Sequence, residues 1–86
     1  MSPLERFYLI DNLLQKHGIV PRATILDELE ISPATFKRDL EYMRSRFNAP
    51  IVWDREAGGY RYDRAPAAGR KFELPGLWFS EREAFA

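Results

Sequence analysis

Apolar residues recur at the spacing of an α-helix along the first part of the chain. They are Phe7, Ile10, Leu13 and Leu14. Ser2, followed three residues later by Glu5, forms a capping box that favours the start of a helix, and glycine is well suited to end one. We therefore predict a first helix between Ser2 and Gly18.

A shorter apolar stripe follows and predicts a second helix from Pro21 to Leu29. Its members are Ile25, Leu26 and Leu29. Val20, directly before it, is a poor N-cap. We expect Val20 instead to be a core contact that fixes where the chain enters the helix.

The third helix has the clearest start. Ser32 is a favoured N-cap, and Ile31 and Phe36 occupy the two positions of a hydrophobic staple. The buried stripe consists of Phe36, Leu40, Met43 and Phe47. Only Glu30 and Ile31 separate the second helix from the cap of the third, so the two helices must cross steeply, as in a helix-turn-helix. The recognition helix is therefore expected over residues 32–47.

Beyond the third helix the apolar pattern changes to that of β-strands. Residues 51–54 and 60–62 are rich in aromatic and β-branched side chains, and two adjacent glycines before the second run permit the positive φ angles of a tight hairpin. A helix-turn-helix followed at once by a hairpin is a winged helix. We therefore predict a mainly α fold of three helices with a small two-stranded wing over residues 51–62, forming one domain over residues 1–63.

Residues 64–86 differ in character from the rest of the chain. Ala65–Gly69 has the composition of a linker, and Ser80 with Glu83 forms a second capping box. We expect a linker followed by the start of a further helix, so that the chain is a fragment with a truncated downstream region.

Composition places the protein among ordinary globular domains. Of its 86 residues 45% are hydrophobic and 30% charged, and no apolar run approaches the roughly 20 residues that span a membrane. Cysteine is absent, which fits the reducing cytoplasm. The 13 basic and 13 acidic side chains cancel, but residues 33–64 hold seven basic and five acidic ones. A nucleic-acid partner therefore has to be argued from local geometry in the middle of the chain.

The same composition argues against catalysis. The single histidine, His17, falls at a predicted helix C-terminus, where a cation favours the helix dipole. No cysteine, glycine-rich phosphate loop or cluster of metal-ligand residues accompanies it. We expect no enzymatic activity, no cofactor and no bound metal.

Helical geometry, at about 100° per residue, separates the two faces of the predicted recognition helix. The N-terminal part of such a helix inserts into the major groove of double-stranded DNA, where arginine can bridge O6 and N7 of guanine and a methyl group can touch thymine. Ala34, Thr35 and Arg38 face outward and are expected to read bases, with Lys37 and Tyr42 nearer the phosphates. With the wing included, the candidate DNA-binding residues are Ser32, Ala34, Thr35, Lys37, Arg38, Tyr42, Arg55 and Arg61.

Several charged side chains of this helix also have a simpler interpretation. Lys37 and Arg38 could be merely solvated. Asp39 would be repelled by phosphates, so we expect it to be structural and to pair with a nearby arginine. Glu41 could accept a hydrogen bond from cytosine N4, but an ion pair with Lys37, four residues earlier, is favoured.

The wing leaves similar alternatives open. Arg55 near its tip and Arg61 on the returning strand could reach a phosphate or the minor groove, or could serve solubility alone. Trp53, Tyr60 and Tyr62 could stack on single-stranded bases, but packing on the helices explains their alternation more simply.

Nearly the whole chain resembles DeoR-like and WYL-domain bacterial transcriptional regulators. Ile25–Ser32 and Thr35–Leu40 resemble their helix-turn-helix, and Ile51–Asp54 with Gly58–Tyr62 looks like their wing. Leu74–Ser80 looks like the joint that leads into the next part of a WYL-domain regulator. The resemblance implies sequence-specific DNA binding, a homodimer in the full-length protein, and a downstream domain that would bind any effector.

Two positions depart from the family pattern. Leu26 stands where the pattern has alanine, and Glu30 where many helix-turn-helix units have glycine. We therefore expect Glu30 to adopt a turn conformation that glycine would take more easily.

The competing hypothesis is a winged helix that serves as a protein-interaction module. The zero net charge favours it. An interaction surface would carry exposed apolar residues on the outward face of the third helix. The residues found there favour DNA: Ala34, Thr35, Arg38, Tyr42 and Ser45.

Overall fold

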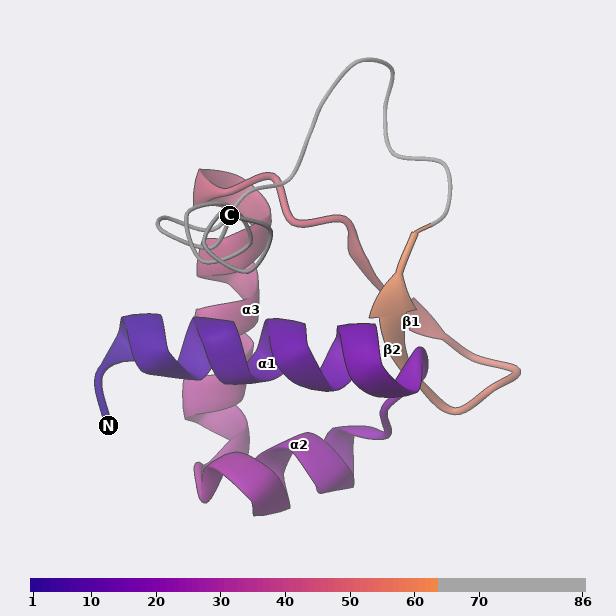
Figure 1. Cartoon of the computed structure of the whole chain (residues 1–86), viewed down its shortest axis with the longest axis horizontal. Coiled ribbons are helices and arrows are strands. Elements are labelled where there is room, and N and C mark those ends of the chain that lie inside the picture. The colour runs from indigo at the N-terminus through magenta and orange to yellow at the C-terminus, as the bar shows by residue number, and fades with distance from the viewer. Residues whose placement is uncertain (64–86) are drawn as a thin grey trace, which may run out of the picture.

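The computed structural model describes residues 1–63, which form three helices followed by an antiparallel hairpin in a winged-helix-like arrangement (Figure 1). The elements are α1 (Pro3–His17), α2 (Arg22–Leu29), α3 (Pro33–Arg46), β1 (Ile51–Asp54) and β2 (Gly59–Tyr62). The predicted mainly α fold with a small hairpin is confirmed. The predicted linker and the helix starting at Ser80 lie outside the described residues. Across residues 1–63, no helix has the length and apolar character of a membrane span.

The helix ends follow the capping signals closely. The Ser2 hydroxyl accepts a hydrogen bond from the Glu5 N–H, and the Glu5 carboxylate accepts one from the Ser2 N–H, which lowers the pKa of Glu5. Gly18, at φ 81°, ends α1. The second helix starts one residue later than predicted, because Pro21 occupies the cap position with an extended backbone.

Glu30 makes the turn between α2 and α3. It lies in the left-handed region, at φ 53° and ψ 50°, as expected from its place in the turn. The Ile31 N–H donates to the Leu26 carbonyl oxygen across this turn. Two residues therefore suffice to redirect the chain into α3, whose N-cap is Ser32.

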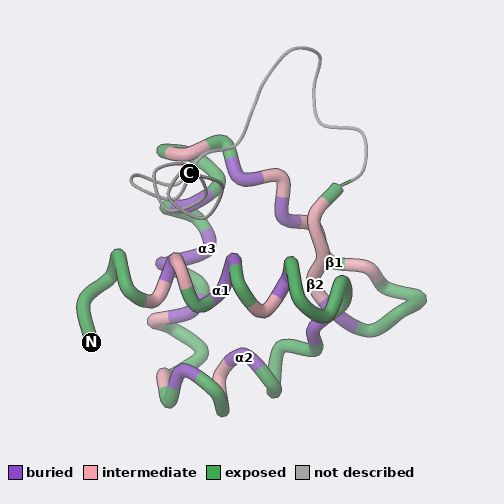
Figure 2. The backbone as a smooth tube through the Cα atoms, viewed as in Figure 1, coloured by how far each residue is buried: buried purple, intermediate pink, exposed green. Residues whose placement is uncertain are grey.

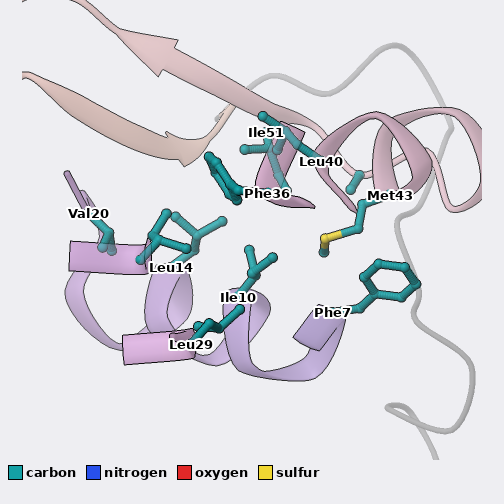
Figure 3. Close-up of a cluster of buried hydrophobic side chains, with 11 residues drawn as sticks. Phe7, Ile10, Leu14, Val20, Leu29, Phe36, Leu40, Met43 and Ile51 are labelled. Carbon is teal, nitrogen blue, oxygen red and sulfur yellow. The ribbon is translucent and has the colours of Figure 1, made fainter. Parts of the chain in front are cut away.

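One hydrophobic core joins the helices and the hairpin. Figure 2 shows the buried positions turned toward the junction of the three helices, with the hairpin tip exposed. In Figure 3, Met43 points between Phe7 and Ile10. The core residues are Phe7, Ile10, Leu14, Val20, Ile25, Leu29, Phe36, Leu40, Met43, Ala49 and Ile51. The predicted core role of Val20 is thus confirmed.

The hairpin is anchored to the segment between α1 and α2, beside the C-terminal end of α1 (Figure 1). The Val20 N–H donates to the Tyr60 carbonyl at 2.9 Å, and the Tyr60 N–H to the Val20 carbonyl at 2.8 Å. The paired glycines serve different needs. Gly58 has φ 72°, whereas a Cβ on Gly59 would lie 2.9 Å from the Val20 carbonyl carbon and oxygen. Gly59 therefore permits close approach of the two backbones.

Candidate nucleic-acid interface

The outward arc of α3 is polar and exposed. With Phe36 and Met43 facing the core, helical geometry places Ala34, Arg38 and Glu41 on the opposite side. All three are exposed. The face predicted to read bases is therefore open to a partner over its first turns.

Asp39 is held by an arginine of another helix. Asp39 is 4% exposed, and its carboxylate accepts two hydrogen bonds from Arg6 of α1, including one at 3.0 Å from Nη2 to Oδ1. This hydrogen bonding raises the pKa of the Arg6 guanidinium. The predicted structural role of Asp39 is confirmed, and its partner is Arg6. Arg38 has no hydrogen-bond or ion-pair partner within residues 1–63.

The expected ion pair between Lys37 and Glu41 is absent from the described part of the chain. Both side chains are exposed. An exposed pair of this kind contributes only about 0.2–0.5 kcal/mol to helix stability, which does not hold two long side chains in one geometry. The ammonium group of Lys37 is thus available to an external anion.

Ser32 and Thr35 stabilise the first turn of α3. The Ser32 hydroxyl accepts a hydrogen bond from the Thr35 N–H at 3.2 Å and donates to Thr35 Oγ1 at 3.1 Å. Thr35 is half-buried, and Ala34 between them is exposed. These two predicted contact residues thereby also fix the part of the helix that would enter a groove.

Tyr42 lies on the side of α3 that faces α1. The residue is 45% exposed, but its ring stacks on Phe7 at 5.3 Å between centroids and meets Phe47 edge-on at 5.6 Å. The Arg46 guanidinium lies 5.6 Å from the ring centroid. Tyr42 is therefore exposed at the edge of the outward arc, and its ring is held in place by its aromatic neighbours.

The two arginines of the wing occupy different environments. Arg55 is exposed at the tip, with no partner within residues 1–63. Arg61 donates to Asp54 Oδ2 at 2.9 Å and to the Tyr62 carbonyl at 3.2 Å. The pKa of Asp54 is lowered first by the Ala57 N–H and then by Arg61. Arg61 thus braces the hairpin, and Arg55 is the one presented to the exterior.

The aromatic residues of the wing pack on the helices, with one exception. Tyr60 meets Phe36 of α3 edge-on at 5.3 Å, and the Tyr62 hydroxyl donates to Asp11 of α1. The rings of Trp53 and Tyr60 lie 5.0 Å apart between centroids, and Trp53 remains 49% exposed. The packing expected for Trp53 is therefore wrong: it shares a face of the hairpin with its cross-strand partner Tyr60, and within the described residues Tyr60 supplies its ring contact.

Sequence reasoning missed Arg22, in the first turn of α2. It is exposed, has no partner in the described part, and lines a groove together with Lys37 and Arg44 of α3. The sequence did contain a signal for Arg22. A cation directly after the predicted start of a helix has few partners within that helix and is therefore a candidate for an external contact. Residues 1–63 contain no cluster of His, Cys, Asp or Glu able to hold a metal ion.

Comparison with known proteins gives no match, whether with family models, curated proteins or solved structures.

Proposed function

We propose that the protein binds double-stranded DNA sequence-specifically, with α3 in the major groove and the hairpin on the backbone or in the minor groove. The observation that carries this proposal is the exposed arc of α3 around Arg38. Because Arg6 occupies the Asp39 carboxylate, Arg38 keeps all its donors for an external partner.

The side chains on this arc match the chemistry of base edges and phosphates. A guanidinium can donate two hydrogen bonds to guanine O6 and N7, and the methyl groups of Ala34 and Thr35 can contact the thymine methyl. Lys37 and Arg55 are exposed cations suited to phosphates. Base readers thus lie near the centre of the surface and phosphate contacts at its edges.

The resemblance to DeoR-like and WYL-domain regulators supports a role as the N-terminal domain of a bacterial transcriptional regulator. On this proposal, the full-length protein is a homodimer that reads paired half-sites. An effector, if one is used, binds a domain downstream of residue 86.

A protein-interaction module is the second candidate function. An apolar groove between α1 and α3 favours it, because Leu4, Phe7, Tyr42 and Phe47 line that groove and Leu4 and Tyr42 are exposed. This groove lies beside the outward arc of α3. A protein partner there would not need Ala34 or Lys37.

The proposal is tested by selecting sites from a randomised duplex library with the wild type, Arg38→Ala and Lys37→Ala. Arg38→Ala should lose about 1–3 kcal/mol of binding free energy on the selected site. It should also relax the base preference at one or two base pairs, as expected when a bidentate base contact is lost. Lys37→Ala should weaken binding to all sequences by the same factor. It should also lower the slope of the logarithm of affinity against the logarithm of salt concentration by about one unit.

Thermal unfolding of the same variants is the control. Both side chains are exposed, so both variants should keep the wild-type midpoint. Absence of any enriched site with the wild type would reject sequence-specific binding. A loss of stability in Arg38→Ala with unchanged selectivity would make Arg38 structural.

A further inference from the structure

We propose that the groove between α3, the start of α2 and β2 holds the phosphates of one DNA strand, with Arg22 as a principal contact. This inference deepens the proposed function and rests on it. The floor of the groove is formed by Phe36, Leu40 and Tyr60 and its rim by Arg22, Lys37 and Arg44. The groove thus combines an apolar floor with cations from two helices, which suits a sugar-phosphate backbone.

The three cations of the rim are available to an anion. Arg22 and Lys37 have no partner within residues 1–63. Arg44 donates only its Nε–H, to the Ile51 carbonyl at 2.9 Å, which fixes the side chain and leaves its remaining N–H donors unused. Glu41 contributes one carboxylate to the lining, so the groove keeps a positive excess.

Tyr60 adds a neutral donor to the groove. Its ring is fixed between Phe36 and Trp53, at centroid distances of 5.3 and 5.0 Å. Its hydroxyl has no hydrogen-bond partner in the described part of the chain. Tyrosine hydroxyls, like arginine and lysine, are common donors to DNA phosphates.

The opposite edge of α3 carries less of this chemistry. The groove there is lined mainly by Leu4, Phe7, Tyr42 and Phe47. Its Arg6 is neutralised by Asp39, so Arg38 is the one cation of its described lining that has no partner, against Arg22 and Lys37 on the hairpin side. The phosphates of one strand are therefore expected on the hairpin side of α3, where the side chains of α2 and β2 meet it.

The test measures affinity for a random-sequence duplex at several salt concentrations, for the wild type, Arg22→Ala and Lys16→Ala. Lys16 is an exposed cation in the last turn of α1 and does not line the groove, so it controls for net charge. Arg22→Ala should lower the salt slope by about one unit and weaken binding on the order of eightfold at 0.1 M salt, while Lys16→Ala keeps the wild-type slope.

Two further variants sharpen the result. Arg22→Lys should restore most of the slope, because the charge is kept. Tyr60→Phe keeps the ring and should weaken binding without changing the slope, because the lost donor is neutral. An unchanged slope in Arg22→Ala, with a wild type that binds duplex DNA, would overturn the groove assignment and leave the proposed function standing. A wild type that shows no salt-dependent duplex binding would overturn both.

Discussion

Glu30 shows how one residue accommodates the tight helix-turn-helix. A left-handed backbone costs a non-glycine residue about 1–2 kcal/mol, and glycine takes it without that penalty. The spacing of the two apolar stripes predicted the tight turn, because only two residues separate the second helix from the cap of the third. The conformation of Glu30 itself was expected because many helix-turn-helix units have glycine at this position. Glu30 is exposed, so its side chain offers little packing in return.

Glu30→Gly is expected to be neutral or to stabilise the domain by up to about 1 kcal/mol, because relief of the positive φ offsets the added entropy of the unfolded chain. Glu28→Gly is the matched control: it is exposed within α2 and should destabilise by about 1 kcal/mol. Thermal or urea unfolding measures both. A several-degree drop in the midpoint of Glu30→Gly would contradict this account.

Pairings between distant residues were not predictable in the same way. Arg6 and Asp39 are 33 residues apart, and Asp11 and Tyr62 are 51 apart. Asp39 was expected to pair with an arginine, because a carboxylate beside phosphates is repelled. Its partner depended on how α1 crosses α3, which no local pattern specifies.

The hairpin is attached to the helices by two contacts of different kinds. One is the backbone pairing of Val20 with Tyr60, and the other is the hydrogen bond from Tyr62 to the buried Asp11. The alternation of residues 51–62 predicted the hairpin itself, because strand and turn signals are local. The exposure of Trp53 was mispredicted. It shares a face of the hairpin with its cross-strand partner Tyr60 but lies next to the turn, and a local alternation does not tell how far the helices extend along that face.

Tyr62→Phe tests this attachment through its pH dependence. Burial, together with the hydrogen bond to Asp11, raises the pKa of Tyr62 in the folded state. In the unfolded chain the pKa of tyrosine is about 10. Below this pH the raised pKa of the folded state contributes its full stabilisation, and this contribution is lost as the pH rises above it. Wild-type stability should therefore fall above about pH 10.

Tyr62→Phe should lack this part of the alkaline loss and should be less stable at neutral pH by about 1–3 kcal/mol, because Asp11 loses a donor. Thermal midpoints recorded from pH 7 to 11 measure both effects. If the variant declined in parallel with the wild type across this range, the linkage of Tyr62 to folding would be refuted.

At the scale of the whole molecule, zero net charge hides an uneven distribution. The unpartnered cations Arg22 and Lys37 line the groove between α3 and the hairpin, while the groove toward α1 is mainly apolar and has Arg38 as its unpartnered cation among the described residues. The outward arc of α3 followed from helical periodicity. The groove did not, because Arg22, Lys37 and Tyr60 come from three elements that only tertiary packing brings together.

The central claim is that DNA lies along α3 and the hairpin. It is tested most directly by amide chemical-shift changes of the ¹⁵N-labelled protein on titration with a selected duplex. The account predicts the largest changes in residues 33–42 and at the hairpin tip, residues 55–58, with little change on the surface between α1 and α2, where Leu9, Asn12 and Glu28 lie. Changes concentrated on that surface, or none at saturating duplex, would contradict it.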